Sequence, residues 1–102
     1  MIWYMYLLSF LAGIFLTNAI PHFVHGISGN KFPTPFAKPH GIGLSSSTTN
    51  VIWALVNLIV GFLLLKLSHF SSNNYLQDFT LFLGISFISL FSSKHFMKKH
   101  KE

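Results

Sequence analysis

The fold of this chain is decided by residues 2–20, which read IWYMYLLSFLAGIFLTNAI and carry no charged side chain. Ser9, Thr17 and Asn18 are the small polar residues of the stretch. As an α-helix the stretch would be about 28 Å long, close to the ~30 Å thickness of the hydrocarbon core of a membrane. Pro21 follows directly and is expected to end or kink the helix, because proline lacks a backbone N–H. The sequence therefore predicts a first membrane-spanning helix over residues 2–20.

Two further apolar stretches predict a second and a third membrane span. Residues 51–67 carry one charged side chain, Lys66, which can extend from the end of the span to the membrane interface. Residues 76–93 are also apolar enough for a span, although several serines dilute their hydropathy. No stretch shows the sustained alternation of apolar and polar residues that is typical of a strand. We therefore expect an all-α integral membrane protein with three transmembrane helices, built as a single membrane domain over residues 1–102.

The composition excludes the common classes of soluble protein. Of the 102 residues 51% are apolar, and the charged side chains are limited to seven lysines, Asp78 and Glu102. A soluble domain is about one-quarter charged, so this chain lacks the groups that cover a water-exposed surface. We therefore exclude a soluble enzyme, a nucleic-acid-binding protein and a disordered chain. Because the chain has no cysteine and so few carboxylates, we expect no enzymatic activity, and the leading interpretation includes no cofactor.

The positions of the lysines predict an orientation in the membrane. Lys31 and Lys38 lie in the first connection, residues 21–50, and four further lysines lie in a basic tail, residues 94–102. Three spans place this connection and this tail on the same side of the membrane, with only Lys66 on the other side. Cytoplasmic segments of membrane proteins are rich in lysine. We therefore expect the connection and the C-terminus in the cytoplasm and the N-terminus outside.

Small and polar residues recur on one face of each predicted helix. Helices associate in membranes where small residues allow a close approach, because lipid provides little hydrophobic drive for association. The predicted seam for helix packing or ligand binding consists of Ser9, Gly13, Thr17, Asn18, Asn57, Gly61 and Gly84. An Asn57 amide that faced lipid would leave its hydrogen-bonding groups unpaired at considerable cost, since the residue lies in mid-span. We therefore expect Asn57 to face another helix.

The first connection is long and rich in proline. It holds all four prolines of the chain, and it keeps apolar residues such as Phe32 and Phe36 that a solvated linker lacks. Loops of this length are usually functional or disordered, and we expect this one to fold back against the helix ends or to lie in the membrane interface. His22 and His25 are spaced i, i+3 and could bind a metal ion or haem, with His40 as a third ligand.

Residues 18–29, NAIPHFVHGISG, and residues 32–37, FPTPFA, resemble a signature of small bacterial inner-membrane proteins of uncharacterised activity. The resemblance implies a location in the inner (plasma) membrane, and it brings no activity and no functional residue. Small multidrug transporters have a similar length. They differ in having four spans and a membrane-embedded Glu in the first helix, whereas residues 2–20 contain no acidic residue.

Three functions are therefore open as hypotheses. The leading one is a non-enzymatic membrane protein that acts by helix association, as a homo-oligomer or as an accessory subunit of a larger membrane complex. The first alternative is a protein that binds or transports a small molecule, a lipid or an ion through residues 21–44 and the asparagines Asn18 and Asn57. The second alternative is metal or haem binding through His22 and His25. The lipid bilayer is a partner in every case, and nucleic acid in none.

Overall fold

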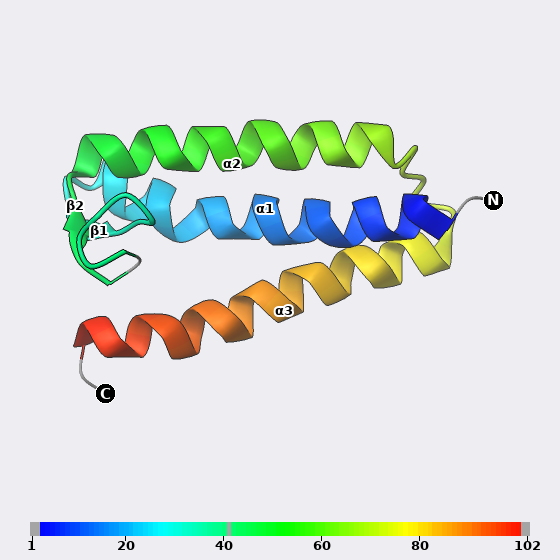
Figure 1. Cartoon of the computed structure of the whole chain (residues 1–102). Helices are drawn as coiled ribbons and strands as arrows, with labels where there is room; N and C mark the ends of the chain where they lie inside the picture. Colours follow the sequence, from blue (N-terminus) through cyan, green and yellow to red (C-terminus); the bar gives the residue numbers. More distant parts are fainter. Residues whose placement is uncertain (1–2, 41, 101–102) are drawn as a thin grey trace.

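A computed structural model describes residues 3–40 and 42–100, and this part of the chain is mainly helical. One helix lies between the other two, and a small two-stranded sheet lies in the connection between the first two helices (Figure 1). The elements are α1 (Trp3–Ile27), β1 (Phe32–Pro33), β2 (Leu44–Ser45), α2 (Ser47–Leu67) and α3 (Tyr75–His100). Each of the three helices is long and apolar enough to cross a membrane, which confirms an all-α fold with three candidate spans.

Helix α1 is longer than the predicted span. Residues 2–20 were expected to form the helix, whereas α1 continues through Pro21 to Ile27. Proline removes one backbone hydrogen bond, and packing of the surrounding residues outweighs that loss. The buried residues around the proline are Ala19, His22 and Gly26. The connection to α2 is consequently residues 28–46, shorter than the predicted 21–50.

Helix α2 begins earlier than predicted and ends where it was expected to end. Its first residue is Ser47, about one turn before the predicted span of residues 51–67. The Ser46 hydroxyl accepts a hydrogen bond from the backbone N–H of Thr49 at 3.1 Å. This contact satisfies one of the N–H groups that have no partner within the helix, and it therefore fixes the start of α2.

Helix α3 joins two segments that were expected to be separate. It includes the third predicted span, residues 76–93, and most of the predicted basic tail, residues 94–102. Residues 101 and 102 lie outside the described part of the chain. The helical backbone carries the tail to the end of the bundle where the 28–46 connection lies (Figure 1).

Two glycines bring the backbones of α1 and α3 into contact. A Cβ atom added at Gly13 would lie 2.5 Å from the carbonyl oxygen of Leu81, and one added at Gly84 would overlap the carbonyl oxygen of Phe10. A side chain at either position would push the helices apart, so glycine is required at both. At Gly61 an added Cβ would meet a leucine of α1, so α2 also lies close to α1.

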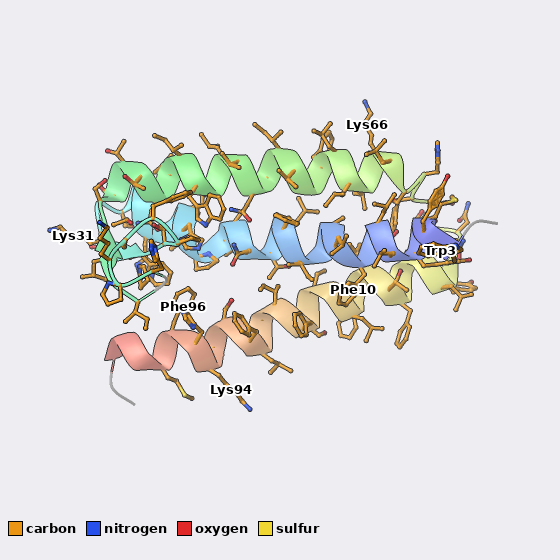
Figure 2. The ribbon with its side chains drawn as sticks, viewed as in Figure 1. Trp3, Phe10, Lys31, Lys66, Lys94 and Phe96 are labelled. Atoms are coloured by element: carbon orange, nitrogen blue, oxygen red, sulfur yellow. The ribbon has the colours of Figure 1, made fainter. Side chains whose placement is uncertain are left out.

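The two ends of the bundle differ in charge. Lys31 lies at the end that holds the connection, and Lys94 lies on the half of α3 near that end (Figure 2). Lys66 lies toward the opposite end, where α1 begins with Trp3 (Figure 2). The bundle therefore has one lysine-rich end. It comprises the 28–46 connection, the end of α1, the start of α2 and the C-terminal half of α3.

Candidate functional site

Asn50 lies at the centre of a buried polar cluster at the lysine-rich end. Its side chain is fully buried near the start of α2. The amide nitrogen Nδ2 donates to three backbone carbonyl oxygens, those of Phe32 at 3.0 Å, Ser45 at 3.3 Å and Ser46 at 3.0 Å. One side chain thus holds both β1 and β2 against the start of α2.

The contacts of Asn50 also fix the hydrogen-bonding state of His22. Carbonyl oxygens only accept, so the Asn50 nitrogen must face the three carbonyls and its oxygen Oδ1 must face His22. The His22 Nδ1 atom lies 2.8 Å from this oxygen and is therefore the donor. In the neutral imidazole the other nitrogen, Nε2, is then an acceptor.

The connection folds over the helix ends. Residues 32–34 are buried, and the hydroxyl groups of Thr34 and Ser45 are hydrogen bonded to each other. The Phe32 ring also contacts Phe96 of α3, with a distance of 4.6 Å between the ring centroids. Since Asn50 ties the same strand to α2, the connection joins the two outer helices at this end of the bundle.

A cavity of about 140 Å³ lies beside this cluster, where the connection meets all three helices. Its lining combines polar groups with aromatic rings, contributed by Asn18, His22, Pro33, Thr34, Pro35, Trp53, Phe91, Ser92, His95 and Phe96. A water molecule takes up about 30 Å³ in the liquid, so the cavity has room for four or five waters or for a chemical group of similar size. Only the folded chain forms this cavity, because every part of the lysine-rich end contributes to it.

Trp53 lines the cavity and carries a buried hydrogen-bond donor. Its Nε1 atom is buried and has no hydrogen-bond partner within the described part of the chain. The ring makes an edge-on contact with Phe36 at a centroid distance of 5.1 Å and another with His22 at 6.5 Å. An indole N–H only donates, and burying a donor without an acceptor costs about 1–3 kcal/mol. An acceptor atom placed next to Nε1 would therefore be stabilised.

Asn18 and Asn57 meet across the contact between α1 and α2. Asn18 Nδ2 donates to Asn57 Oδ1 at 3.2 Å, and Asn57 Nδ2 donates to the carbonyl oxygen of Trp53 at 2.8 Å. Asn57 is buried and faces another helix, as expected from its place in mid-span. Asn18 lines the cavity and has a second N–H besides the one bonded to Asn57.

The other residues of the predicted seam lie in or beside the contacts between helices. Gly13 and Gly84 form the backbone contact of α1 with α3, and Gly61 packs on α1. Ser9 is fully buried, and its hydroxyl donates to a carbonyl oxygen of its own helix at 3.0 Å. Thr17 is half-buried. None of these five residues lines the cavity, so the structure separates the packing residues of the seam from Asn18.

The histidines named as candidate metal ligands are all held by contacts with other residues of the chain. His22 Nδ1 is bonded to Asn50, the His25 ring stacks on the Phe32 ring, and His40 Nδ1 lies 2.7 Å from a carbonyl oxygen of the connection. Within residues 3–40 and 42–100, no group of three or more His, Cys, Asp or Glu could hold a metal ion. His22 and His25 both contact the Phe32 ring, whereas His40 is held within the connection, so metal binding by these histidines stays a hypothesis.

Three residues with buried polar atoms were not among the predicted site residues. Trp53 is near the start of a span, and nothing in the sequence indicates that its N–H is buried. Gln77 is buried at the opposite end, where its Nε2 donates to the carbonyl oxygen of Ser68 at 2.9 Å. Asn50 lies seven residues before Asn57 and extends the same helix face, although the predicted seam did not include it.

Comparison with known proteins adds no relative: no protein-family model, no curated protein and no solved structure matches the chain. The resemblance of residues 18–37 to small bacterial inner-membrane proteins therefore stays a prediction. The function is consequently inferred from the geometry of the lysine-rich end.

Proposed function

We propose that this chain is a multi-pass membrane protein that binds a small molecule, a lipid or an ion at its lysine-rich end. The observation that carries this proposal is the cavity lined by Asn18, His22 and Trp53, whose buried indole N–H has no acceptor among the described residues. Unpaired polar groups are costly inside a membrane, and helices that merely pack together have no need of them. A largely aromatic cavity that contains a few polar side chains and lies within a candidate span therefore supports binding over packing alone.

The distribution of acidic groups supports a non-enzymatic role. Asp78 is the only carboxylate side chain of the described residues, and it lies in the first turn of α3, at the end opposite the cavity. The cavity lining offers imidazole and hydroxyl groups without a carboxylate. General acid–base chemistry usually relies on a base that a second group orients and charges, so these residues favour holding a ligand over converting it.

The charge difference between the two ends supports an orientation in the membrane. Lys31, Lys38 and Lys94 belong to the lysine-rich end, and Lys66 lies near the other. Because lysines accumulate on the cytoplasmic side of membrane proteins, we place the 28–46 connection and the end of α3 in the cytoplasm. The start of α1 is then outside, and the resemblance to bacterial proteins adds the inner membrane as the location.

Reporter fusions are expected to confirm this orientation. Alkaline phosphatase, which folds only outside the cytoplasm, should be active when it is joined after Ser72, in the turn between α2 and α3. The same enzyme joined after residue 102 should be inactive, and a green fluorescent protein at that position should fluoresce. An active phosphatase at the C-terminus would show that the orientation is reversed.

A second function, association as a homo-oligomer or as an accessory subunit, is favoured by the exposure of α3. Only 11% of its candidate span is buried inside the chain, compared with 28% for α1 and 22% for α2. The small residues Gly13, Gly61 and Gly84 are used for contacts within the chain. An association would therefore use the outer face of α3, which in a monomer would face lipid.

Native mass spectrometry of the protein released from mild detergent distinguishes the two functions. Binding predicts the mass of the chain plus a small molecule or lipid, whereas association predicts a dimer or a complex with another protein. Asn18→Leu is expected to reduce the bound species at least tenfold, because leucine removes the amide groups at the cavity while keeping their size. The control is Asn73→Leu, at an exposed position in the α2–α3 turn. A bare monomer in every preparation would contradict both functions.

A further inference from the structure

We infer that the cavity at the lysine-rich end holds an anionic oxygen group, a carboxylate or a phosphate, which accepts a hydrogen bond from Trp53 Nε1. This inference rests on the proposed binding function and adds the chemistry of the ligand.

Each of the three helices contributes to the cavity lining a residue that carries a hydrogen-bond donor. Trp53 of α2 has its buried N–H without a partner in the described part of the chain. Ser92 of α3 lines the same cavity, and its hydroxyl makes no hydrogen bond with the residues that the structure describes. Asn18 of α1 donates one amide N–H to Asn57, and its second N–H has no hydrogen bond with the described residues. Carboxylate and phosphate oxygens have several lone pairs, so one such group can accept from more than one of these donors.

The charge around the cavity favours an anion over a neutral carbonyl. Lys31 and Lys38 lie in the connection, and Lys94 lies two residues after Ser92 on α3; all three lysines are exposed. Asp78 lies fourteen residues before Ser92, which corresponds to about 21 Å along the helix. With these lysines and no carboxylate of the described residues nearby, the local potential is positive and attracts an oxyanion.

The size and depth of the cavity suit a head group and not a whole lipid. Its volume of about 140 Å³ accommodates a few heavy atoms. Trp53 lies six residues after the start of α2, about 9 Å along the helix from the lysine-rich end. A lipid can bring a head group to this depth and place its acyl chain along exposed apolar residues of α3 such as Leu90 and Phe91. A small free anion would present the same oxygen atoms.

The two tryptophans of the chain provide a direct optical measurement. Trp3 is 73% exposed at the opposite end, so Trp3→Phe leaves Trp53 as the sole tryptophan without altering the cavity. The Trp3→Phe protein, purified in dodecyl maltoside, is titrated separately with dodecanoate, acetate and inorganic phosphate. Dodecyltrimethylammonium serves as the control, because it has the same chain length and a cationic head without an oxygen acceptor.

Dodecanoate or one of the free anions is expected to change the Trp53 emission saturably, and dodecyltrimethylammonium is not. Saturation with dodecanoate alone identifies a lipid-borne head group as the ligand. Saturation with acetate or phosphate at similar concentrations identifies a free anion. The absence of a saturable change with all three oxyanions, or an equal change with the cationic control, overturns the inference.

Trp53→Phe tests the role of the indole N–H itself. Phenylalanine keeps an aromatic ring and removes the donor, so calorimetric affinity for the probe that binds best should fall at least tenfold. Trp3→Phe is the matched control, and its affinity should equal that of the unmodified chain. Equal binding by Trp53→Phe would refute the inferred chemistry and leave the binding function standing if a ligand still co-purifies. If the unmodified chain, Trp3→Phe and Trp53→Phe all fail to bind a probe and no molecule co-purifies, the inferred ligand chemistry and the binding function are both refuted.

Ser92→Ala provides a second variant should Trp53→Phe fail to fold, as judged by circular dichroism. The position is half-buried on α3, and alanine removes only the hydroxyl. The same probe should bind several-fold more weakly, because one donor to the oxyanion is lost. Ser93→Ala, at an exposed position next to it, should bind the probe as the unmodified chain does.

Discussion

Replacing Asn50 with leucine is expected to release the 28–46 connection from the helix ends while the three helices stay folded. Leucine matches asparagine in size and has no hydrogen-bonding group. His22 Nδ1 and the carbonyl oxygens of Phe32 and Ser45 would each lose the Asn50 partner. A buried group that loses its hydrogen-bond partner, such as His22 Nδ1, costs about 1–3 kcal/mol, so the closed connection should lose about 2 kcal/mol. That corresponds to an opening about 30-fold more frequent.

Trypsin measures this opening at one bond. Lys31 is exposed and is followed by buried residues, so cleavage after it requires the connection to open first. Lys38 precedes Pro39 and is therefore resistant to trypsin. The rate of cleavage after Lys31, followed by mass spectrometry, should rise about 30-fold in Asn50→Leu.

Thr48→Leu is the matched control for this prediction. Thr48 is exposed in the same first turns of α2, so its replacement should leave the cleavage rate unchanged. Asn50→Asp keeps an acceptor for His22 and removes the donor to the carbonyls, so it should also open the connection. Unchanged cleavage after Lys31 in Asn50→Leu would mean that Asn50 does not hold the connection.

Gly84→Ala is expected to destabilise the bundle, although alanine favours a helix by about 1 kcal/mol relative to glycine. The Cβ atom of alanine would itself overlap the carbonyl oxygen of Phe10, so α1 and α3 must move apart. Overpacking of this kind typically costs about 1–3 kcal/mol. The midpoint of unfolding in a titration with sodium dodecyl sulfate, followed by circular dichroism, should therefore fall.

Ser93→Ala controls for helix propensity alone. Ser93 is exposed on the same helix, so alanine there should leave the midpoint unchanged or raise it slightly. A lower midpoint of unfolding for Gly84→Ala, together with an unchanged or higher midpoint for Ser93→Ala, would identify the close contact of α1 with α3 as the cause. A Gly84→Ala protein as stable as the unmodified chain would exclude that backbone contact.

The candidate spans could be predicted because length and the absence of charge are local properties of a chain. Residues 2–20 and 51–67 are long enough and apolar enough to cross a membrane whatever their neighbours are. The same holds for the burial of Asn57, since an amide in mid-span must find a partner. Its partner, Asn18, lies 39 residues away in the sequence, and no spacing rule joins the two.

The end of α1 and the site depend on contacts that no local pattern contains. Pro21 signals the end of a helix, and burial of Ala19, His22 and Gly26 overrides that signal. The bond between His22 and Asn50 joins residues 28 apart in the sequence, and it occupies one ring nitrogen of His22.

By itself the sequence determined three apolar helices, their lysine-rich end and the need for small residues between them. The tertiary structure alone decided which polar groups meet, which glycines touch a neighbouring backbone, and that the indole N–H of Trp53 lacks a partner within the described residues. The physical reason is that hydropathy depends on the composition of one segment, whereas a hydrogen bond depends on the positions of two segments after folding.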